Sequence, residues 1–483
     1  MRRTRVRSAA VVLVTAAAIS AATAGIAAGG VSGAAGGSAT TLSAAGSIPP
    51  DAVRLHPDAI HVGKATASPY TTAECKRILR ISCYSPAQVR QAYNLRPLYR
   101  RGITGRGQTI VVVDSFGSPT IKRDLAVFDA TFNLPAPPSF TVVQPAGAVP
   151  PYQASSDREG WAGETTLDVE YAHTMAPGAA ILLVETPTSE NEGTTGFPQI
   201  VTAEEYVINN DLGGVISQSF SATEQTFPTA QSLLDLRAAY LDAAGSGVTV
   251  LAAAGDSGAA DVEYNGTTYY TYPVTSWPDS DPVVTGIGGT QLHLDAAGNR
   301  ISPDTVWNDT YDPAAQAYVG GNAGPSPLAG GGGKSIIFER PPFQDGVAKV
   351  VGDHRGVPDI SMSAACNGAV DTYQSFPGQG TGWYPTCGTS EATPLFAGVV
   401  ALADQLAGHP LGVINPALYT LSAEHAPGIV DVTEGNNTVS WTVGTKLQTV
   451  TGYQALKGYD LATGVGTVNA AKFVPELVAA SPA

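Results

Sequence analysis

The stretch "GWAGETTLDVEYAHTMAPGAAILLVE", residues 160–185, decides the fold. Its first part is amphipathic and predicts a helix over residues 160–175. After a Pro-Gly pair, residues 180–185 form a short, near-continuous apolar run, which is typical of a strand buried on both faces. A helix followed by such a strand indicates a unit of a parallel sheet.

The same alternation continues along the chain. The expected strands are 109–114, 180–185, 214–220, 248–254 and 283–287, and the expected helices are 160–175, 199–210 and 229–244. Strand, helix and strand in this order predict an α/β fold with helices on both faces of a parallel sheet. Residues 303–390 are rich in loops, and we expect them to decorate this core rather than to form a second domain.

The composition excludes several classes of protein. Of 483 residues, 54 are Gly and 35 are Pro, and 43% are apolar, so disorder, collagen and coiled coil are not expected. The formal net charge of −15 opposes the counterion release that drives nucleic-acid binding. We therefore expect no nucleic-acid partner.

The N-terminus resembles an export signal. Arg2, Arg3, Arg5 and Arg7 precede an apolar run over about residues 8–22, and the small residues that follow predict cleavage near Ala24. An uncleaved anchor is the alternative. No later stretch reaches the length of a membrane span, so we expect a secreted, extracellular chain with no membrane association after cleavage. Residues 25–83 are expected to be a flexible linker or short pro-segment.

Four cysteines, an even number in an exported chain, suit two local disulfides. The simplest pairing joins Cys75 to Cys83 and Cys366 to Cys387, and four free thiols are the alternative. Neither pair has the spacing of a zinc site.

Ser390 lies in "GTSEATPLFAGVVALADQLAG", residues 388–408, where small residues lead into an apolar helix. A serine at this position stands at the positive end of a helix dipole, where a developing oxyanion is stabilised. Taken alone, it is more simply an N-cap serine. A nucleophilic serine needs a base, but no histidine lies in a suitable turn, and His173 sits in the middle of a helix as a surface or packing residue.

Carboxylates offer an alternative base. Glu164 and Asp168 are four residues apart on the expected helix, so both project from one face, and apolar neighbours suggest partial burial. Two acids in a poorly solvated site share a proton, and one of them titrates upward. Asp256, in "AAAGDSGA", directly follows an expected strand, at the edge where ligands meet parallel sheets. Each of these residues also has a purely structural interpretation. Glu164 and Asp168 would then lie on a solvated helix face, and Asp256 would be a turn residue.

Together, "GETTLDVE", "AAAGDSGA" and "GTSEATPLFAG" resemble the sedolisin family of serine-carboxyl peptidases. The resemblance covers most of the chain after about residue 84 and extends through "VISQSFSATEQ", "VVTGIGGT", "GGGGKSIIFERPPFQ", "RGVPDIS" and "GVINPALY". It implies a subtilisin-like parallel seven-stranded sheet and a catalytic domain over residues 84–483. The implied roles are Ser390 as nucleophile, Glu164 as general base and acid, Asp168 as the residue that orients Glu164, and Asp256 as an oxyanion-hole group.

The resemblance also implies one structural Ca²⁺ near the C-terminus. The implied ligands are the side chains of Asp431 and Asp460 and the carbonyls of Val432, Leu456 and Gly458. The family commonly has Gly where this chain has Leu456, so that ligand depends on a backbone that still adopts the turn.

The implied function is a monomeric, acid-active endopeptidase or tripeptidyl-type peptidase, because a carboxylate base works in acid where an imidazole is protonated. The rival is a secreted binding or wall-associated protein on a dead peptidase fold. Two features depart from the family pattern. The segment between the signal and the catalytic region is too short for the family's folded pro-domain. In addition, Phe220-Ser221 stands where many relatives have Trp-Gly.

Two motifs point to other chemistry. Asp114 suggests an Asp/His/Ser triad, but without the histidine turn we expect it to end its strand as a turn residue. "GGGGKS" lacks the first Gly of a phosphate loop, since Leu328 stands there, and is expected to be a flexible border of the substrate cleft.

Overall fold

The computed structural model describes residues 59–319 and 324–481. In this part of the chain the main sheet has eight strands in the order β11-β10-β8-β6-β3-β5-β4, and β14 pairs with β10. The strands are β3 (Thr109–Ser115), β4 (Phe140–Val143), β5 (Ala180–Thr186), β6 (Val215–Gln218), β8 (Thr249–Ala253), β10 (Thr285–Gln291), β11 (Thr305–Val306) and β14 (Ile360–Ser363). Only β11 runs antiparallel to its neighbour, so seven strands are parallel, which confirms the expected subtilisin-like sheet.

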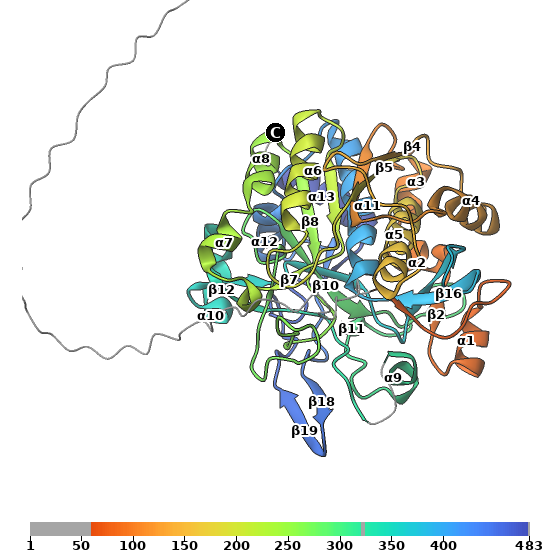
Figure 1. Cartoon of the computed structure of the whole chain (residues 1–483). Helices are drawn as coiled ribbons and strands as arrows, with labels where there is room; N and C mark the ends of the chain where they lie inside the picture. Colours follow the sequence, from red (N-terminus) through yellow and green to blue (C-terminus); the bar gives the residue numbers. More distant parts are fainter. Residues whose placement is uncertain (1–58, 320–323, 482–483) are drawn as a thin grey trace, which may run out of the picture. The chain divides into compact units, whose positions relative to one another are not determined.

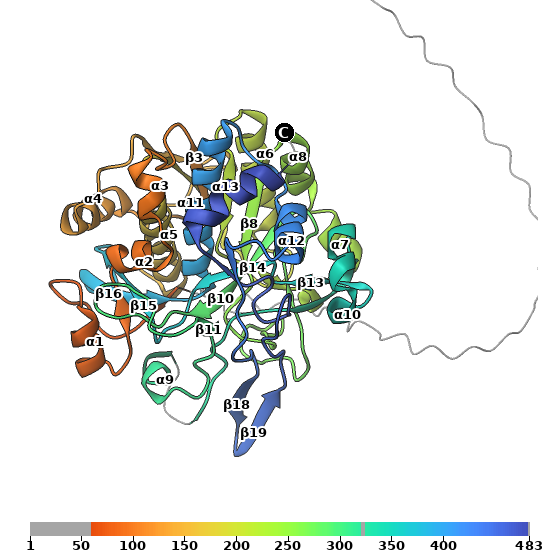
Figure 2. The same cartoon turned by 180° about the vertical axis from the view of Figure 1, so that it is seen from behind.

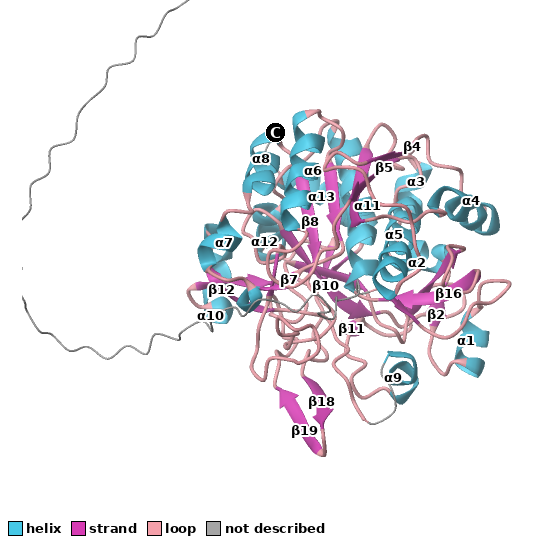
Figure 3. Ribbon diagram, viewed as in Figure 1, coloured by secondary structure: helices cyan, strands magenta, loops and turns pink. Residues whose placement is uncertain are grey.

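Helices cover both faces of this sheet (Figures 1 and 3). Helices α5 (Ser156–Met175) and α11 (Thr389–Ala407) pack together on one face, and α6 (Phe197–Asn209) and α8 (Ala238–Ser246) cover the other. The reason lies in the alternation of side chains along a strand. Ile110 and Val112 of β3 enter the first core, whereas Val111 and Val113 enter the second.

The remaining helices surround this core, as the view from behind shows for α12 and α13 (Figure 2). They are α1 (Thr72–Ile78), α2 (Pro86–Ala92), α3 (Arg96–Arg100), α4 (Ile121–Phe132), α7 (Ala230–Leu234), α9 (Pro313–Val319), α10 (Ala348–Val351), α12 (Asn415–Ala423) and α13 (Ala470–Ala480).

Small sheets lie beside the main one. A four-stranded sheet has the order β1 (Ile60–His61), β16 (Gly382–Cys387), β15 (Ala369–Gln374) and β2 (Cys83–Tyr84). The two-stranded pairs are β7 (Ala222–Thr223) with β9 (Ser276–Trp277), β12 (Gly333–Glu339) with β13 (His354–Val357), β17 (Ile429–Val430) with β20 (Thr467–Val468), and β18 (Val439–Val443) with β19 (Lys446–Val450).

Several sequence expectations need correction. The single helix expected over 229–244 is two helices, α7 and α8, because Arg237 between them turns to Asp281 in a two-bonded ion pair of 2.6 and 2.8 Å. The strand expected over 214–220 ends at Gln218, and that expected over 283–287 is β10, which runs from Thr285 to Gln291. The loop-rich stretch 303–390 is more than decoration, since it supplies β14 to the main sheet.

Residues 59–83 are not a flexible linker. They contain β1, α1 and the start of β2, and Val62 and Cys75 are fully buried in the main core. The expected signal over 1–24 and the rest of the expected linker lie outside the described residues. Both expected disulfides, Cys75–Cys83 and Cys366–Cys387, are present. Among the described helices, none combines the length and the apolar character that crossing a membrane requires.

Buried carboxyl groups are frequent in this fold. Burial raises the pKa of Asp404 in α11 to about 8 and that of Glu224 to about 7, although each accepts hydrogen bonds from neighbouring groups. Burial likewise raises the pKa of Asp309 to about 6. Since the folded state prefers the neutral acid, each group stabilises the fold at low pH. That contribution declines as the pH rises from the unfolded pKa, near 4, towards the folded one.

We therefore predict a melting temperature that falls between about pH 4 and pH 8. The variant Asp404→Asn, which keeps the shape and removes the charge, should match wild type at about pH 4 and melt several degrees higher at about pH 8. Scanning calorimetry across this range measures the effect, with Asp242→Asn on the exposed surface of α8 as the matched control. A flat wild-type profile, or equal slopes in all three proteins, contradicts the prediction.

Candidate active site

Polar residues gather where parallel strands end. Asp114 is the last residue but one of β3, Ser219 directly follows β6, and Asp256 lies three residues after β8. Because all these strands run in one direction, their carboxyl ends meet at one edge of the sheet. The helices α5 and α11, which carry Glu164, Asp168 and Ser390, pack together against these strands.

Ser219 joins the two helices. Its Oγ donates to Asp168 Oδ1 at 2.7 Å and lies 3.5 Å from the carbonyl oxygen of Ser390. All three residues are fully buried. Two of the expected catalytic residues are thus brought together through a serine that the sequence analysis missed. Its place directly after a strand of the parallel sheet was the signal that pointed to it.

Asp168 lies among other acids. Burial raises its pKa well above the usual range, and the negative charges of Asp114 and Glu164 raise it further, against the lowering effect of the Ser219 hydrogen bond. Burial also raises the pKa of Asp114 to about 7. Asp114 is therefore not the turn residue expected from the sequence, since it lies inside β3 with no exposed surface. Asp168 and Asp114 therefore keep their protons at a pH where free carboxyl groups have lost them.

Glu164 is fully buried on α5, one turn before Asp168. Its Oε2 accepts a hydrogen bond of 2.8 Å from the backbone N–H of Ala59. The carboxylate expected to act as a base therefore faces a polypeptide nitrogen that comes from the N-terminal part of the chain.

Ser390 is the second residue of α11 rather than its N-cap. The N-cap is Gly388, whose φ of 128° is one that residues with a side chain rarely adopt. Within the described residues Ser390 Oγ makes no hydrogen bond, so the hydroxyl is not consumed in capping the helix. The bland N-cap interpretation is therefore wrong for this serine.

Asp256 is tied to the start of the same helix. Its Oδ1 accepts hydrogen bonds from the backbone N–H and from Oγ1 of Thr389, both at 2.7 Å. This places the carboxyl group beside the residue that precedes Ser390. The structure thus brings Asp256 to the N-terminus of α11, where an oxyanion would be stabilised.

The glycine run over residues 330–333 holds the Asp256 loop in place. Gly331 donates to the carbonyl of Gly255 at 2.8 Å, and Ala329 donates to that of Asp256 at 2.9 Å. A Cβ on Gly331 would overlap the carbonyl oxygen of Ala254. The run is buried, so the expectation that it is flexible is wrong, and glycine is needed here for close packing.

The remaining sequence candidates have structural roles. His173 is fully buried and its Nε2 lies 2.7 Å from the carbonyl oxygen of Pro135, so it is a packing residue. Phe220 is 3% exposed and packs edge-on against Trp161 and Phe197.

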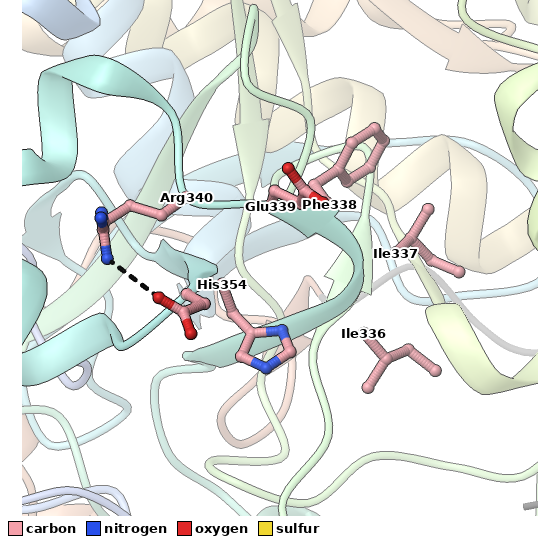
Figure 4. Close-up of a pocket in the computed structure, with 7 residues that line it drawn as sticks. Ile336, Ile337, Phe338, Glu339, Arg340 and His354 are labelled. Carbon is pink, nitrogen blue, oxygen red and sulfur yellow. Dashed lines mark hydrogen bonds and ion pairs between the residues drawn. The ribbon is translucent and has the colours of Figure 1, made fainter. Parts of the chain in front are cut away.

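The hollow in Figure 4, of about 630 Å³, lies on β12 and β13. It is lined by Ile336, Ile337, Phe338, Glu339, Arg340, Asp353 and His354. It contains none of the expected catalytic residues, so this hollow does not mark the acid cluster.

The expected calcium ligands lie close to one another. Gly458 donates to Asp431 Oδ2, and Leu456 donates to Asp460 Oδ2, both at 2.9 Å. The φ angle of Leu456 is not positive, so a residue with a side chain is tolerated there, whereas Gly458 has a φ of 82°. Two carboxylates together with backbone carbonyls would supply only oxygen ligands, which is the donor type that Ca²⁺ prefers. Among the described residues no group of three or more His, Cys, Asp or Glu side chains is placed to hold a metal, so such a site depends on carbonyl ligands.

This fold and this site define a subtilase. The model of the subtilase family matches residues 158–418, more than half of the chain. Kumamolisin from Bacillus sp. (strain MN-32) is 34% identical over 392 residues, 80% of this chain and 62% of the relative. Sedolisin from Pseudomonas sp. (strain 101) is 28% identical over 370 residues, 76% of this chain and 57% of the relative. Human tripeptidyl-peptidase 1 is 28% identical over 323 residues, 63% of this chain and 50% of the relative.

A solved structure agrees in fold. It is described as Pseudomonas sedolisin, a serine-carboxyl proteinase, complexed with two molecules of pseudo-iodotyrostatin. It matches 86% of this chain and 99% of its own, with a TM-score of 0.66 at 24% identity. The chain belongs to the sedolisin family of serine peptidases. It spans less than two thirds of the length of the three curated relatives named above.

The glycine packing beside Asp256 leads to a prediction about stability. Gly331→Ala forces the Cβ against the Ala254 carbonyl, so we expect a loss of about 2 kcal/mol or more in the free energy of unfolding. Gly346→Ala is the matched control, because a Cβ there meets nothing within 4 Å. Denaturant unfolding of both variants measures the difference. Equal free energies of unfolding in the two variants would contradict the prediction, because they would show that the Asp256 loop accommodates the added Cβ without loss of stability.

Proposed function

We propose that this chain is a secreted serine-carboxyl peptidase that hydrolyses peptide bonds in acid. In this proposal residues 84–483 form the catalytic domain, and the monomeric enzyme cleaves as an endopeptidase or releases tripeptides. The observation that carries the proposal is the buried contact of Ser219 with Asp168 and with the Ser390 carbonyl, with Glu164 one turn before Asp168 on the same helix.

The chemistry follows from the acids. Glu164 takes the proton of Ser390 Oγ as the hydroxyl attacks the substrate carbonyl, and Asp168 orients Glu164. Because Asp168 keeps its proton well above the usual range, it places no negative charge beside Glu164 in acid.

Asp256 stabilises the oxyanion that forms in this attack. Its Oδ1 already accepts two hydrogen bonds from Thr389, so a proton on this carboxyl group belongs on Oδ2. A protonated Asp256 can donate a hydrogen bond to the oxyanion, which an ionised one cannot.

Asp114 sets the upper pH limit of the proposed activity. As the pH rises through its pKa of about 7, a further negative charge enters the cluster and activity should fall.

We predict casein hydrolysis with an optimum at about pH 3 to 5. Ser390→Ala and Glu164→Gln should each lower kcat by roughly 10⁴-fold or more, since nucleophile and base act as a unit. Glu424→Gln, which changes an exposed acid after α12, is the control and should retain wild-type activity.

Equal residual signal in wild type and Ser390→Ala would overturn the proposal and favour a binding protein on a peptidase fold. An optimum confined to neutral or alkaline pH would exclude a carboxylate base.

We also propose one structural Ca²⁺ held by Asp431 and Asp460 with the carbonyls of Val432, Leu456 and Gly458. The all-oxygen donor set and the closeness of the two loop segments support it. The ion would stabilise the folded chain without taking part in the reaction.

Chelation should then lower the melting temperature. The expected loss is about 2.7 kcal/mol relative to free Ca²⁺ at about 100 times its Kd. Asp431→Asn should abolish the response, whereas Asp295→Asn, in an exposed loop elsewhere, should retain it. Calorimetry with and without a chelator provides the measurement. An identical melting curve under both conditions argues against the site.

A further inference from the structure

The hairpin of β18 and β19 projects from the body of the described chain (Figures 1 and 2). Its base is held in a small apolar core that contains Val439 and Val450. Its tip is open to solvent, where Val443 and Leu447 are 56% and 57% exposed. Neither of these two side chains packs in an apolar cluster of the described residues, so folding alone does not account for them.

The outer edge of β19 is unpaired. Within the part of the chain that the structure describes, its one strand partner is β18, and the two form a two-stranded sheet. Val443 and Lys446 flank the two-residue turn and form a hydrogen-bonded pair, so the alternation directs the backbone N–H and C=O of Leu447 outward. An open strand edge of this kind can pair with another extended chain.

A groove of about 730 Å³ lies along one face of this hairpin. Trp441 and Gln448 are directly opposite each other in the ladder, and Val443 lies two residues beyond Trp441, so these side chains share the face that lines the groove. Tyr269, from the loop that follows Asp256, packs on Trp441 with the ring centroids 5.2 Å apart. Leu447 lies on the opposite face, so the two faces of the tip offer separate contacts.

The lining of the groove is uncharged. It consists of Thr, Ser, Tyr, Trp, Val, Gln, Pro and Gly residues from within the segments 267–271, 324–327 and 441–448. In a chain with a formal net charge of −15, such a lining fits a ligand that is itself uncharged and partly apolar. A polypeptide meets this description below about pH 4, where its carboxyl groups are largely neutral. The hydroxyl and amide groups of the lining can bind its backbone.

The walls of the groove are built on the loop that carries Asp256. Gly258, two residues after Asp256, lies against the base of the hairpin, since a Cβ there would overlap Val439 Cγ1. Ala329, two residues after Pro327 of the groove, donates from its N–H to the carbonyl of Asp256 at 2.9 Å. Its own carbonyl accepts from the N–H of Gly258 at 2.8 Å. The groove is therefore continuous with the loop of the proposed oxyanion group.

We propose that the hairpin and this groove dock a polypeptide substrate through residues that lie beyond those held at the catalytic centre. An extended stretch of the substrate adds a third strand to the hairpin along β19. Alternate side chains of that stretch then enter the groove or cover Leu447. This inference rests on the proposed function, since it takes the substrate to be a polypeptide that passes Asp256.

The tip of the hairpin lies beyond the reach of a short peptide. Each strand has five residues, so the tip is about 17 Å from the base at about 3.4 Å per residue. A peptide of about six residues spans about 20 Å when extended, or about 10 Å to either side of the bond that is cut. Longer chains alone can therefore occupy the catalytic centre and the tip together.

The first test compares a long and a short substrate. The double variant Val443→Thr/Leu447→Thr removes the apolar tip and keeps residues that favour a strand, and a melting curve checks that it is folded. We expect KM for casein to rise about tenfold with kcat unchanged, because docking contributes to binding and not to the reaction. Both constants should stay at the wild-type value for a peptide of about six residues.

The matched control removes exposed apolar side chains elsewhere. Leu241 and Ile301 are 50% and 67% exposed, on α8 and in a separate loop. The double variant Leu241→Gln/Ile301→Thr should therefore match wild type on both substrates.

A second test separates docking from catalysis. Ser390→Ala, whose melting curve shows that it is folded, is mixed with casein at about pH 4 and followed by hydrogen exchange. We expect the outward backbone N–H of β19 to exchange at least about tenfold more slowly when casein is bound. The short peptide should give no such protection, and adding Val443→Thr/Leu447→Thr to Ser390→Ala should remove it.

The other results are equally decisive. An equal loss of activity on casein and on the short peptide overturns the proposal, because it places the effect at the catalytic centre. An unchanged KM for casein, or unchanged exchange in β19, also overturns it. A folded wild-type chain that hydrolyses neither substrate refutes the proposed function itself, and the exchange experiment still decides whether the hairpin binds a polypeptide.

Discussion

The structure depends on the cost of ionising carboxyl groups that are removed from water. Glu164, Asp168 and Asp114 lie together at the carboxyl edge of the sheet, and no basic side chain contributes to the pKa of Asp168. Ser219 donates a hydrogen bond to Asp168 and lies 3.5 Å from the Ser390 carbonyl oxygen, so it links α5 to the start of α11. Burial and the neighbouring negative charges raise the pKa of Asp168, and burial raises that of Asp114, so protons stay on these two acids and allow them to lie close together.

The same physics extends beyond the site. Asp404 and Glu224, on separate elements, are also buried, and burial raises the pKa of each to about 8 and about 7. Acidic pH therefore favours both the stability of the fold and the proposed chemistry. A fold that keeps its acids neutral is most stable where a carboxylate base works and an imidazole base would be protonated.

Close packing of the backbone fixes the positions of the residues at the candidate active site. Gly331 lies against Ala254 and holds the Asp256 loop, and Gly398 lets α11 approach Met175 of α5. Gly388 supplies the unusual φ angle from which α11 begins. The positions of Asp256, Glu164 and Ser390 thus depend on glycines whose role is to leave space. Figures 1 and 3 show α5 and α11, the two helices that carry Glu164, Asp168 and Ser390, side by side.

The sequence alone determined the parallel sheet, both disulfides and the candidate catalytic residues, because apolar runs, cysteine separation and the motif letters are local properties. Only the tertiary structure decided the roles of Asp114 and Ser219, since their meaning comes from strand ends that meet across the sheet. The contact between Ala59 and Glu164 was invisible for the same reason, because the two residues are 105 positions apart in the chain. Long-range pairing leaves no periodic trace in a sequence, whereas burial and hydrogen bonding reveal it once the chain has folded.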